Sequence, residues 1–497
     1  MTLRIRRACA LMSTVLLFSA SCATVDPRAA LQTADAAMER QTGVKTTWAA
    51  LPPLRAWTLD AQGLLALEDA INMALVNNRG LRGDLEVIGQ YQAEVVQAGL
   101  LANPVLTLMT GFPEGGGRAS VAFGLSKDFA ELWLIPARKR AAQALVQQKV
   151  LTVAQTAIEL IAEVTTTYRT LAYQALAVEL QEKNLNVLRE SMEIAQVRQR
   201  TGSSTLLDVN LIRARFVEAE VDLKEARTEF QLTQRRLLRL MGVAGATDAW
   251  RPAPLMMDEP VMPEWDEAPL VEAALLQRLD VQTARWELES AMAALDLERR
   301  KVLPMFGLGL GGERFERRAS PDRDILADTV RATTAAGGDL TAPEIQSSAE
   351  RRKERRQEID FMLGPSLEIP LPIFDQNQAQ IAKAHFRARE LAAWLAEAEQ
   401  RATEGVRVAL VTQRLNAEKV RIFRESLVPI EESNLGLARA AYQAGKESIS
   451  TILLAQESLI RARLAQAAGV RDLAISIAEL DRESGGRLPQ MAVAVDP

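Results

Sequence analysis

One order of predicted elements occurs twice along the chain, and this duplication limits the possible folds more than any other feature. Each half predicts a helix, two short strands, a long helix, a turn and a return helix. The first repeat is expected at residues 65–242 and the second at 269–484, with a linker or equatorial segment at 243–268 between them. The fold class is therefore mainly α with a small β part, duplicated as a strand pair followed by a long helical hairpin.

Each half carries two short segments in which apolar residues alternate with small or polar ones. Strands are predicted at four places, with approximate bounds 104–110, 119–128, 303–311 and 363–373. One apolar face and one small or polar face is the pattern of a barrel strand between lipid and water. A small soluble sheet packed on helices would show the same alternation and is the alternative, although Pro370 and Pro372 argue against a central strand there.

The strands decide how the mature chain can cross a membrane, because no segment after the N-terminus holds about 20 consecutive apolar residues. A crossing without such a helix needs strands closed into a barrel, and about eight strands form the smallest membrane barrel. The four strands of one chain are too few for this. If they span the membrane, three copies supply a twelve-stranded barrel, so membrane insertion implies a homotrimer.

A long helical hairpin follows each pair of strands, at the expected bounds 136–241 and 375–482. The first long helix should extend for roughly 100 Å, at about 1.5 Å per residue. Apolar residues at 3-4 spacing along both hairpins are typical of coiled-coil packing. Gly202 and Gly445 end the long helices, and Pro429 is expected to kink the second one. An insertion at 312–362, expected to be a loop with room for a surface helix, separates the third and fourth strands.

The N-terminus predicts export and a lipid anchor. Residues 1–21 are a basic and then apolar segment that is too short to span a membrane, as in a signal peptide. Ala20-Ser21-Cys22 resembles a lipoprotein processing site, which implies lipidation of the Cys22 thiol; an ordinary secretory signal is the alternative. The other terminal segments are an N-terminal periplasmic extension and a C-terminal tail, expected at 22–64 and 485–497.

Composition excludes several kinds of function. Cys9 and Cys22 are the only cysteines and His385 is the only histidine, so disulfides, thiol or His-based catalysis and zinc sites are poor hypotheses. The net charge of −5 gives no basic field for nucleic acid. No phosphate loop, paired carboxylates or metal cluster is visible, and the sequence therefore predicts no enzyme, no metal site and no cofactor.

Several short motifs follow one another in a fixed order along the two repeats. They are Ala98-Gly99-Leu100-Leu101-Ala102-Asn103-Pro104, Gly202 to Val209, Leu371-Pro372-Ile373-Phe374-Asp375 and Tyr442-Gln443-Ala444-Gly445. Through them the chain resembles the TolC family of outer-membrane efflux proteins. The resemblance implies a trimer with a twelve-stranded outer-membrane β-barrel that a periplasmic α-helical barrel continues. It also implies two partners, a periplasmic adaptor (membrane fusion) protein and an inner-membrane pump of the RND type.

The same resemblance implies functional residues at the tips of the two hairpins. Adaptor contacts are expected at Gly202, Ser203, Thr205, Gly445, Lys446 and Ser448. The periplasmic gate is expected among Asp208, Tyr442, Glu447, Thr451 and Leu454. Family members commonly carry Asp where this chain has Thr451 and Leu454, so we expect a water-excluding constriction that includes Leu454 instead. Asp208 and Tyr442 are expected to help hold neighbouring helices closed.

The sequence thus predicts a lipid-anchored outer-membrane channel subunit of a tripartite efflux pump in a Gram-negative bacterium. Substrates would pass by passive conduction from the adaptor and pump to the exterior, with outer-membrane lipid around the strands. The alternatives are an outlet of a type I protein secretion system, a periplasmic coiled-coil lipoprotein without a pore, and an outer-membrane lipoprotein enzyme. The sequence does not identify the exported substrate.

Overall fold

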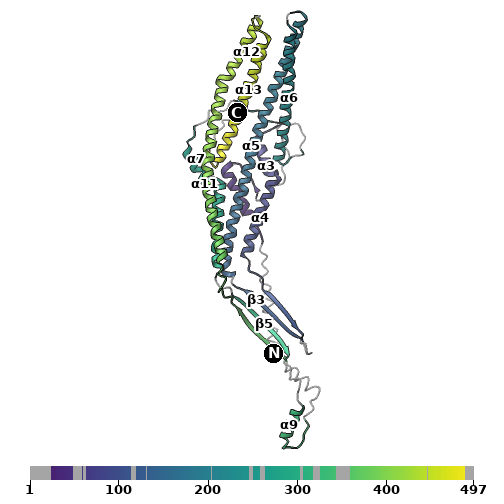
Figure 1. Cartoon of the computed structure of the whole chain (residues 1–497), viewed down its shortest axis with the longest axis vertical. Helices are drawn as coiled ribbons and strands as arrows, with labels where there is room; N and C mark the ends of the chain where they lie inside the picture. The colour runs from purple at the N-terminus through teal and green to yellow at the C-terminus, as the bar shows by residue number, and fades with distance from the viewer. Residues whose placement is uncertain are drawn as a thin grey trace. The chain divides into compact units, whose positions relative to one another are not determined.

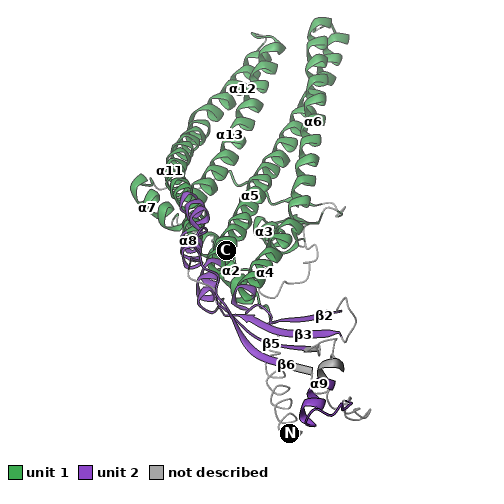
Figure 2. Ribbon diagram, turned by 60° about the horizontal axis from the view of Figure 1, so that its bottom comes forward, with its two compact units in different colours: residues 1–96, 142–291, 387–497 green, residues 97–141, 292–386 purple. Residues whose placement is uncertain are grey.

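The computed structural model describes most of the chain. The described residues are 24–48, 59, 63–112, 119–129, 131–202, 204–243, 245, 250–257, 264–302, 306–316, 325–342, 359–444, 446–486 and 488. Cys22, the signal peptide 1–21, Ser203 and Gly445, all singled out above, lie outside them. The chain divides into unit 1, residues 1–96, 142–291 and 387–497, and unit 2, residues 97–141 and 292–386 (Figure 2).

The regular structure of unit 1, in its described residues, is a set of helices, most of them labelled in Figure 1, and one short parallel strand pair, β1 (Leu64–Leu65) with β4 (Arg251–Pro252). Four of its helices, α4, α5, α8 and α11, also contribute residues to unit 2. Helix α2 (Arg28–Thr42) precedes the first repeat, whose helices are α3 (Leu67–Asn77), α4 (Arg79–Gly99), α5 (Glu131–Arg200) and α6 (Leu206–Leu240). Those of the second repeat are α7 (Glu267–Gln277), α8 (Leu279–Arg300), α11 (Gln378–Ile422), the π-helical η2 (Phe423–Leu427), α12 (Val428–Gln443) and α13 (Ile449–Glu483).

The largest buried cluster of unit 1 includes the N-terminal helix α2. It brings together Met38 of α2, Met73 of α3, Ile88 of α4, Leu171 of α5 and Leu237 of α6, all buried. Burial of each such side chain contributes about 1.5–3 kcal/mol relative to exposure. The segment 22–64, expected only as an extension, therefore supplies part of the core of the first repeat.

The helix expected at the start of the first repeat is two helices, α3 and α4, because the backbone is extended at Asn78 (φ −61°, ψ 118°). The Asn78 side-chain amide donates to the Leu240 carbonyl at 3.0 Å, at the end of α6. Gly242, at φ +71°, lets the chain after α6 approach closely, since a Cβ there would overlap the Asn77 carbonyl. The contacts at this break therefore hold the α3–α4 segment, at the start of the repeat, against the end of α6.

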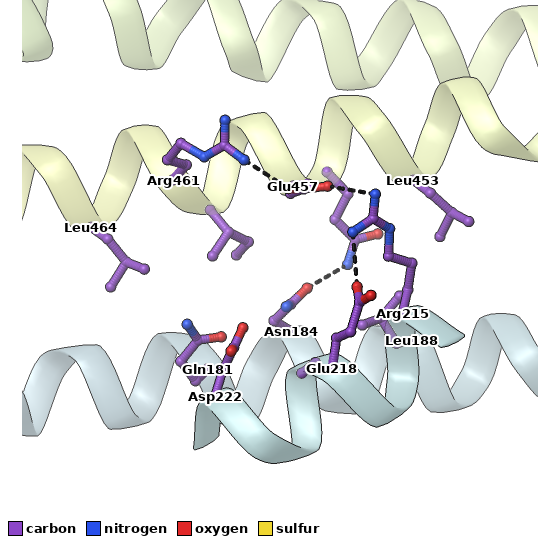
Figure 3. A pocket seen from close by; sticks show the side chains of 13 residues that line it. Gln181, Asn184, Leu188, Arg215, Glu218, Asp222, Leu453, Glu457, Arg461 and Leu464 are labelled. Atoms are coloured by element: carbon purple, nitrogen blue, oxygen red, sulfur yellow. Dashed lines mark hydrogen bonds and ion pairs between the residues drawn. The ribbon is translucent and has the colours of Figure 1, made fainter. Parts of the chain in front are cut away.

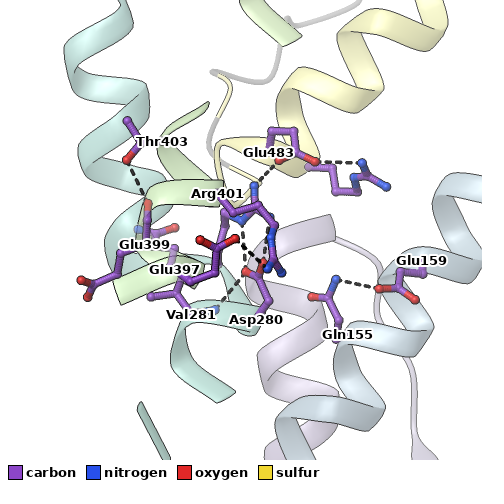
Figure 4. A network of polar contacts seen from close by, with 12 residues as sticks. Gln155, Glu159, Asp280, Val281, Glu397, Glu399, Arg401, Thr403 and Glu483 are labelled. Carbon is purple, nitrogen blue, oxygen red and sulfur yellow. Dashed lines mark hydrogen bonds and ion pairs between the residues drawn. The ribbon is translucent and has the colours of Figure 1, made fainter. Parts of the chain in front are cut away.

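The second repeat has the matching break at Arg278 (φ −56°, ψ 129°), between α7 and α8. The Arg278 side chain is only 13% exposed and pairs with Asp280 of α8 and Glu483 of α13. Figure 4 labels these two carboxylates in the surrounding polar network. Burial alone would raise the pKa of Asp280, but the hydrogen bonds and charge of Arg278 hold it below its ordinary value. The break in the first repeat is thus held by the neutral side-chain amide of Asn78, and the corresponding break in the second repeat is held by the charged side chain of Arg278.

The first long helix, α5, begins at Glu131 and has 70 residues, although Pro136 was the predicted start. Pro136 is the sixth residue of α5, where its missing N–H removes a single bond to the Leu132 carbonyl. The first turns of a helix already lack several such bonds, so a proline there does not end it.

The interruption predicted near Pro429 is the π-helical segment η2, directly before α12. The Val428 N–H donates to the Phe423 carbonyl, five residues back rather than four. Pro429 has no N–H and would press against the Glu425 carbonyl in a regular α-helix. The wider π turn relieves that clash, and the helix then resumes.

Unit 2 contains an antiparallel sheet of four strands in the order β2-β3-β5-β6. The strands are β2 (Val105–Gly111), β3 (Ser120–Asp128), β5 (Gly307–Glu316) and β6 (Ile359–Glu368). Helix α9 (Ile325–Ala335) lies between β5 and β6 in the chain. Sequential neighbours are paired throughout, so both repeats contribute to one sheet.

The last two strands differ in extent from the predicted 303–311 and 363–373. The ladder continues to the pair Glu316–Ile359, so residues 317–358 separate β5 from β6, rather than the predicted insertion 312–362. β6 ends before Pro370 and Pro372, which cannot donate to a ladder. The alternation of apolar with small or polar residues predicted that both strands exist. It did not predict their full length, because the ends that lie inside the insertion carry charged residues that interrupt the alternation.

None of the described helices combines the length and the apolar character that a membrane-spanning helix requires.

Candidate functional site

The sheet of unit 2 has one apolar face. Across the four strands, the ladder aligns Leu108, Phe123, Gly312 and Leu363 in one row and Leu106, Leu125, Leu310 and Pro365 in the next. The Phe123 ring stacks on Phe361 with a centroid distance of 6.1 Å. Leu106 and Leu108 are 73% and 70% exposed, so this face is uncovered in the single chain. A large exposed apolar surface marks a contact with lipid or protein.

The opposite face of the sheet consists mainly of small and polar residues. One row contains Thr107, Gly124, Gly311 and Gly364, and another contains Val105, Ser126, Gly309 and Ser366. Among the described side chains, Val105, Met109 and Met362 are the large apolar exceptions. Such a face suits water, as the sequence pattern predicted.

Both outer strands have an open edge. β2 pairs only with β3 and β6 only with β5 among the described strands. Each edge therefore presents unpaired backbone N–H and C=O groups beside an apolar face. In lipid these groups have no water to bind, so such edges require partner strands.

Aromatic rings gather where the sheet meets the helices of unit 2. Phe306, before β5, lies 6.3 Å from the Phe129 ring and 5.6 Å from the Trp133 ring of α5. The Phe129 N–H also donates to the Phe306 carbonyl at 3.1 Å. Aromatic residues at the end of an apolar band are typical of a membrane–water boundary.

The first hairpin tip is a glycine turn followed by a capped helix. Gly202 has φ +77°, and the Thr205 hydroxyl accepts from the Asp208 N–H at the start of α6. Asp208 Oδ2 accepts from the Thr205 N–H at 2.9 Å, which completes a capping box. That backbone bond, and then the hydroxyls of Thr205 and Ser204, lower the pKa of Asp208. Its contacts are therefore local, and a role for Asp208 in joining helices stays a prediction.

The second tip lacks such a cap. Ser448 precedes α13 in extended conformation, and its side chain accepts no capping bond. The Lys446 N–H donates to the Ala441 carbonyl at 3.0 Å, and the Thr451 hydroxyl donates to the Glu447 carboxylate at 2.9 Å. Leu454 is 64% exposed, so its side chain is available to a constriction formed with other copies.

Tyr442 joins the two hairpins through a residue that the sequence did not single out. Arg198, in the last turn of α5, donates to the Tyr442 hydroxyl, and its guanidinium lies 5.0 Å from the Tyr442 ring centroid. A cation over an aromatic ring attracts it electrostatically. Arg198 and Tyr442 are 244 residues apart, a pairing that no local spacing could reveal.

Further from the tips, α13 lies beside α5 and α6 across a cavity of about 230 Å³ (Figure 3). Gln456 of α13 donates to Asn184 of α5 at 3.1 Å, and Arg215 of α6 pairs with Glu457 of α13 at 3.4 Å. Burial raises the pKa of Asp222, and nearby carboxylates raise it further. These contacts, like Arg198–Tyr442, link one hairpin to the other.

The described residues contain no group of three or more His, Cys, Asp or Glu side chains placed to hold a metal ion. His385 lies on α11 with its ring edge-on to Phe386, at 6.3 Å between centroids.

Proteins of known family and structure are similar to this chain in sequence and in fold. Residues 270–486 match the model of the family described as outer membrane efflux protein. The cobalt-zinc-cadmium resistance protein CzcC of Cupriavidus metallidurans is 22% identical over 420 residues, which cover 82% of this chain and 86% of CzcC.

Two solved structures share the fold. A membrane protein from Pseudomonas aeruginosa superimposes with a TM-score of 0.64 at 20% identity, covering 88% of this chain and 98% of the other. The Campylobacter jejuni CmeC outer membrane channel gives 0.65 at 15% identity, covering 84% and 85%. At these identities the structural likeness concerns the fold alone. The match to the outer membrane efflux protein family covers the second repeat, and the structural likeness extends the same fold over most of the chain.

Proposed function

We propose that three copies of this chain form a passive conduit through the outer membrane, and that the conduit is the exit of a tripartite efflux assembly. The observation that carries the proposal is the sheet of unit 2, with one apolar face, one small or polar face and two open edges. Lipid would cover the apolar face, and water would fill the side lined by the glycines and serines.

Closure by copies of the same chain follows from the two edges. β6 of one copy pairs with β2 of the next, and three sets of four strands give a closed barrel of twelve. Closure satisfies every edge group in the hydrocarbon, which a single chain cannot do. A small soluble sheet would instead have its apolar face packed on helices, whereas Leu106 and Leu108 are exposed.

The two hairpin tips are the proposed docking surface for a periplasmic adaptor. On the first tip the surface comprises Gly202, Ser203 and Thr205, and on the second Gly445, Lys446 and Ser448. Leu206 and Leu207 beside the first tip are 64% and 66% exposed, which supports a protein contact there. An inner-membrane pump of the RND type would supply the energy through the adaptor, so the chain itself needs no catalytic site.

The gate is proposed at the second hairpin, where Leu454 with Thr451 and Glu447 would narrow the periplasmic mouth. An apolar ring can close a pore by excluding water, without a ring of carboxylates. The Arg198–Tyr442 contact would hold the hairpins in the closed arrangement. Lipidation of Cys22 would add an anchor beside the barrel.

Planar-bilayer recording of the purified mature chain tests this function. We expect a detergent-stable trimer that inserts and conducts, with low conductance until the tips are loosened. A polypeptide that stays monomeric in detergent and never conducts would contradict the proposal. CzcC is named for cobalt, zinc and cadmium resistance, so tolerance of these ions in a deletion strain is the first cargo test.

A further inference from the structure

A groove of about 510 Å³ lies in unit 2 between the last turn of α8 and the first turns of α11. It is lined by Arg299, Val302, Gln376, Gln378, Ile381, Ala382, His385 and Phe386. Neither the proposed conduit nor the hairpin tips use these residues. The lining combines one charged side chain with an apolar wall, which is the composition of a site for an amphiphile.

The two walls of the groove are fastened to each other. Asn377 has φ +60°, and its side-chain amide donates to the Glu298 carbonyl at 2.8 Å and to the Glu298 carboxylate at 2.7 Å. A non-glycine residue in this conformation is uncommon, and these bonds explain why it is held. The start of α11 is thereby fixed against the end of α8, so the groove exists before any ligand arrives.

Arg299 is the one Arg, Lys, Asp or Glu side chain among the described lining residues. The next two residues of the chain also carry positive charge but are already paired, Arg300 with Asp296 at 2.8 Å and Lys301 with Glu298 at 2.5 Å. Within the described ranges, Arg299 has no ion-pair partner. Its guanidinium is thus available to an external anion.

The apolar side of the groove continues along the chain toward the sheet. Phe386 in the lining is 64% exposed, and the residues just before the groove, Leu371, Ile373 and Phe374, are 72%, 66% and 91% exposed. They follow the end of β6, while the aromatic cluster of Phe129 and Phe306 lies before β5. Both features belong to the end of the apolar sheet from which the helices continue.

We propose that this groove binds an anionic phospholipid at the periplasmic boundary of the membrane, an inference that rests on the membrane-spanning role proposed for the sheet. Arg299 would bind the phosphate, as guanidinium groups do through paired N–H donors, and His385 would donate to the same headgroup. The acyl chains would lie on Phe386 and Ile381. Basic pockets beside apolar helix surfaces are known to take lipid headgroups.

The apolar wall distinguishes a lipid from free phosphate. Phosphate alone would gain nothing from Phe386, Ile381 and Val302, whereas an acyl chain removes their surface from water. The single positive charge of Arg299 also equals in magnitude the single negative charge of a phospholipid phosphodiester.

Lipid binding to the full-length trimer tests the proposal, by native mass spectrometry in detergent with phosphatidylglycerol or phosphatidylcholine as the probe. We expect wild-type protein to retain phosphatidylglycerol in preference. Arg299→Gln should weaken phosphatidylglycerol binding roughly fivefold to tenfold, the scale of one partly solvated charge-assisted bond. Arg300→Gln makes the same charge change one residue away, outside the groove, and should keep the wild-type preference. Phe386→Ala should weaken both lipids.

Three results would overturn the lipid site. They are equal retention of the two lipids by wild-type protein, equal losses in the Arg299 and Arg300 variants, and removal of the preference by millimolar inorganic phosphate. A groove covered by a second copy in the trimer would give the first result. Conductance of the wild-type protein is recorded separately: a conducting trimer without lipid preference overturns this inference alone, while a non-conducting monomer overturns the proposed function.

Discussion

Single residues determine how the ends of the return helices are held. Gly486 has φ +75°, and a Cβ there would overlap the backbone of Gln41 at the end of α2. The Gln41 side chain in turn donates to the Gln277 carbonyl at 2.5 Å, just before the break at Arg278. Asp481, near the end of α13, accepts the Leu488 N–H at 3.1 Å. These contacts join the N-terminal helix, α7 and α13 at one place.

Replacement of Gly486 by alanine should therefore be damaging. The strained φ and the displacement of α2 together should lower the free energy of unfolding by roughly 2–4 kcal/mol. Gly83→Ala is the matched control, because Gly83 lies within α4 with open space around its Cα. That variant should be neutral or stabilising by up to about 1 kcal/mol. Thermal unfolding followed by circular dichroism compares the two, and equal shifts would contradict the close approach at Gln41.

Asp481 should make stability depend on pH. Burial raises its pKa to about 6 from an ordinary value of 3.8, partly offset by the Leu488 N–H. Because the folded-state pKa is the higher one, Asp481 contributes stability that is complete below about pH 3.8 and is lost as pH rises through 6. Asp481→Asn keeps an acceptor for Leu488 without the charge.

That variant should be more stable than wild type at pH 7.5, by at most about 3 kcal/mol at about 1.4 kcal/mol per pKa unit. The difference should shrink toward zero near pH 4. Unfolding temperatures measured across this range check the sign. A variant that is destabilised at pH 7.5, or a difference independent of pH, would show that burial of the Asp481 charge is not unfavourable.

At the scale of elements, residue patterns within a few positions of each other predicted the helical hairpins well. They did not predict contacts between residues that lie far apart in the sequence. The return helices begin at Leu206 and Ile449, each directly after a Thr or Ser that precedes an apolar run in the sequence. The breaks at Asn78 and Arg278 were missed, because apolar spacing continues across them while the side chains bond to helices far along the chain. The Arg198–Tyr442 contact was hidden for the same reason.

The contact between α5 and α12 should hold the channel closed. Arg198→Ala removes both the hydrogen bond and the cation over the ring, so closed-state conductance should rise several-fold. Tyr442→Phe keeps the ring and should give a smaller rise. Arg200→Ala, which removes the same kind of charge from the same turn of α5, should leave conductance at the wild-type level.

Asp208→Ala tests whether Asp208 or Arg198 holds the two hairpins together. Its carboxylate caps α6, so the variant should lower the unfolding temperature by the equivalent of about 1 kcal/mol. If its closed-state conductance rises more than that of Arg198→Ala, Asp208 rather than Arg198 joins the hairpins, and the assignment from the single chain is wrong.

At the scale of the whole molecule, we propose that the single chain is incomplete. The sheet of the described residues has four strands, and two of its rows carry apolar side chains on a face that the single chain leaves uncovered. The strand count and alternation, both visible in the sequence, already implied an assembly, whereas the register that aligns those rows required the structure. Assembly by pairing of β6 with β2 satisfies the edges and the apolar face together.

Disulfide cross-linking of those two strands tests the central claim most directly. A panel of variants would each carry one cysteine in β2, residues 105–111, and one in β6, residues 359–368, with single-cysteine variants as background. Gly124→Cys with Gly311→Cys, neighbours within one sheet, is the positive control for oxidation. We predict covalent dimers and trimers on non-reducing gels for pairs in register. If the control pair oxidises and every β2–β6 pair remains monomeric, three copies of this chain do not close a barrel.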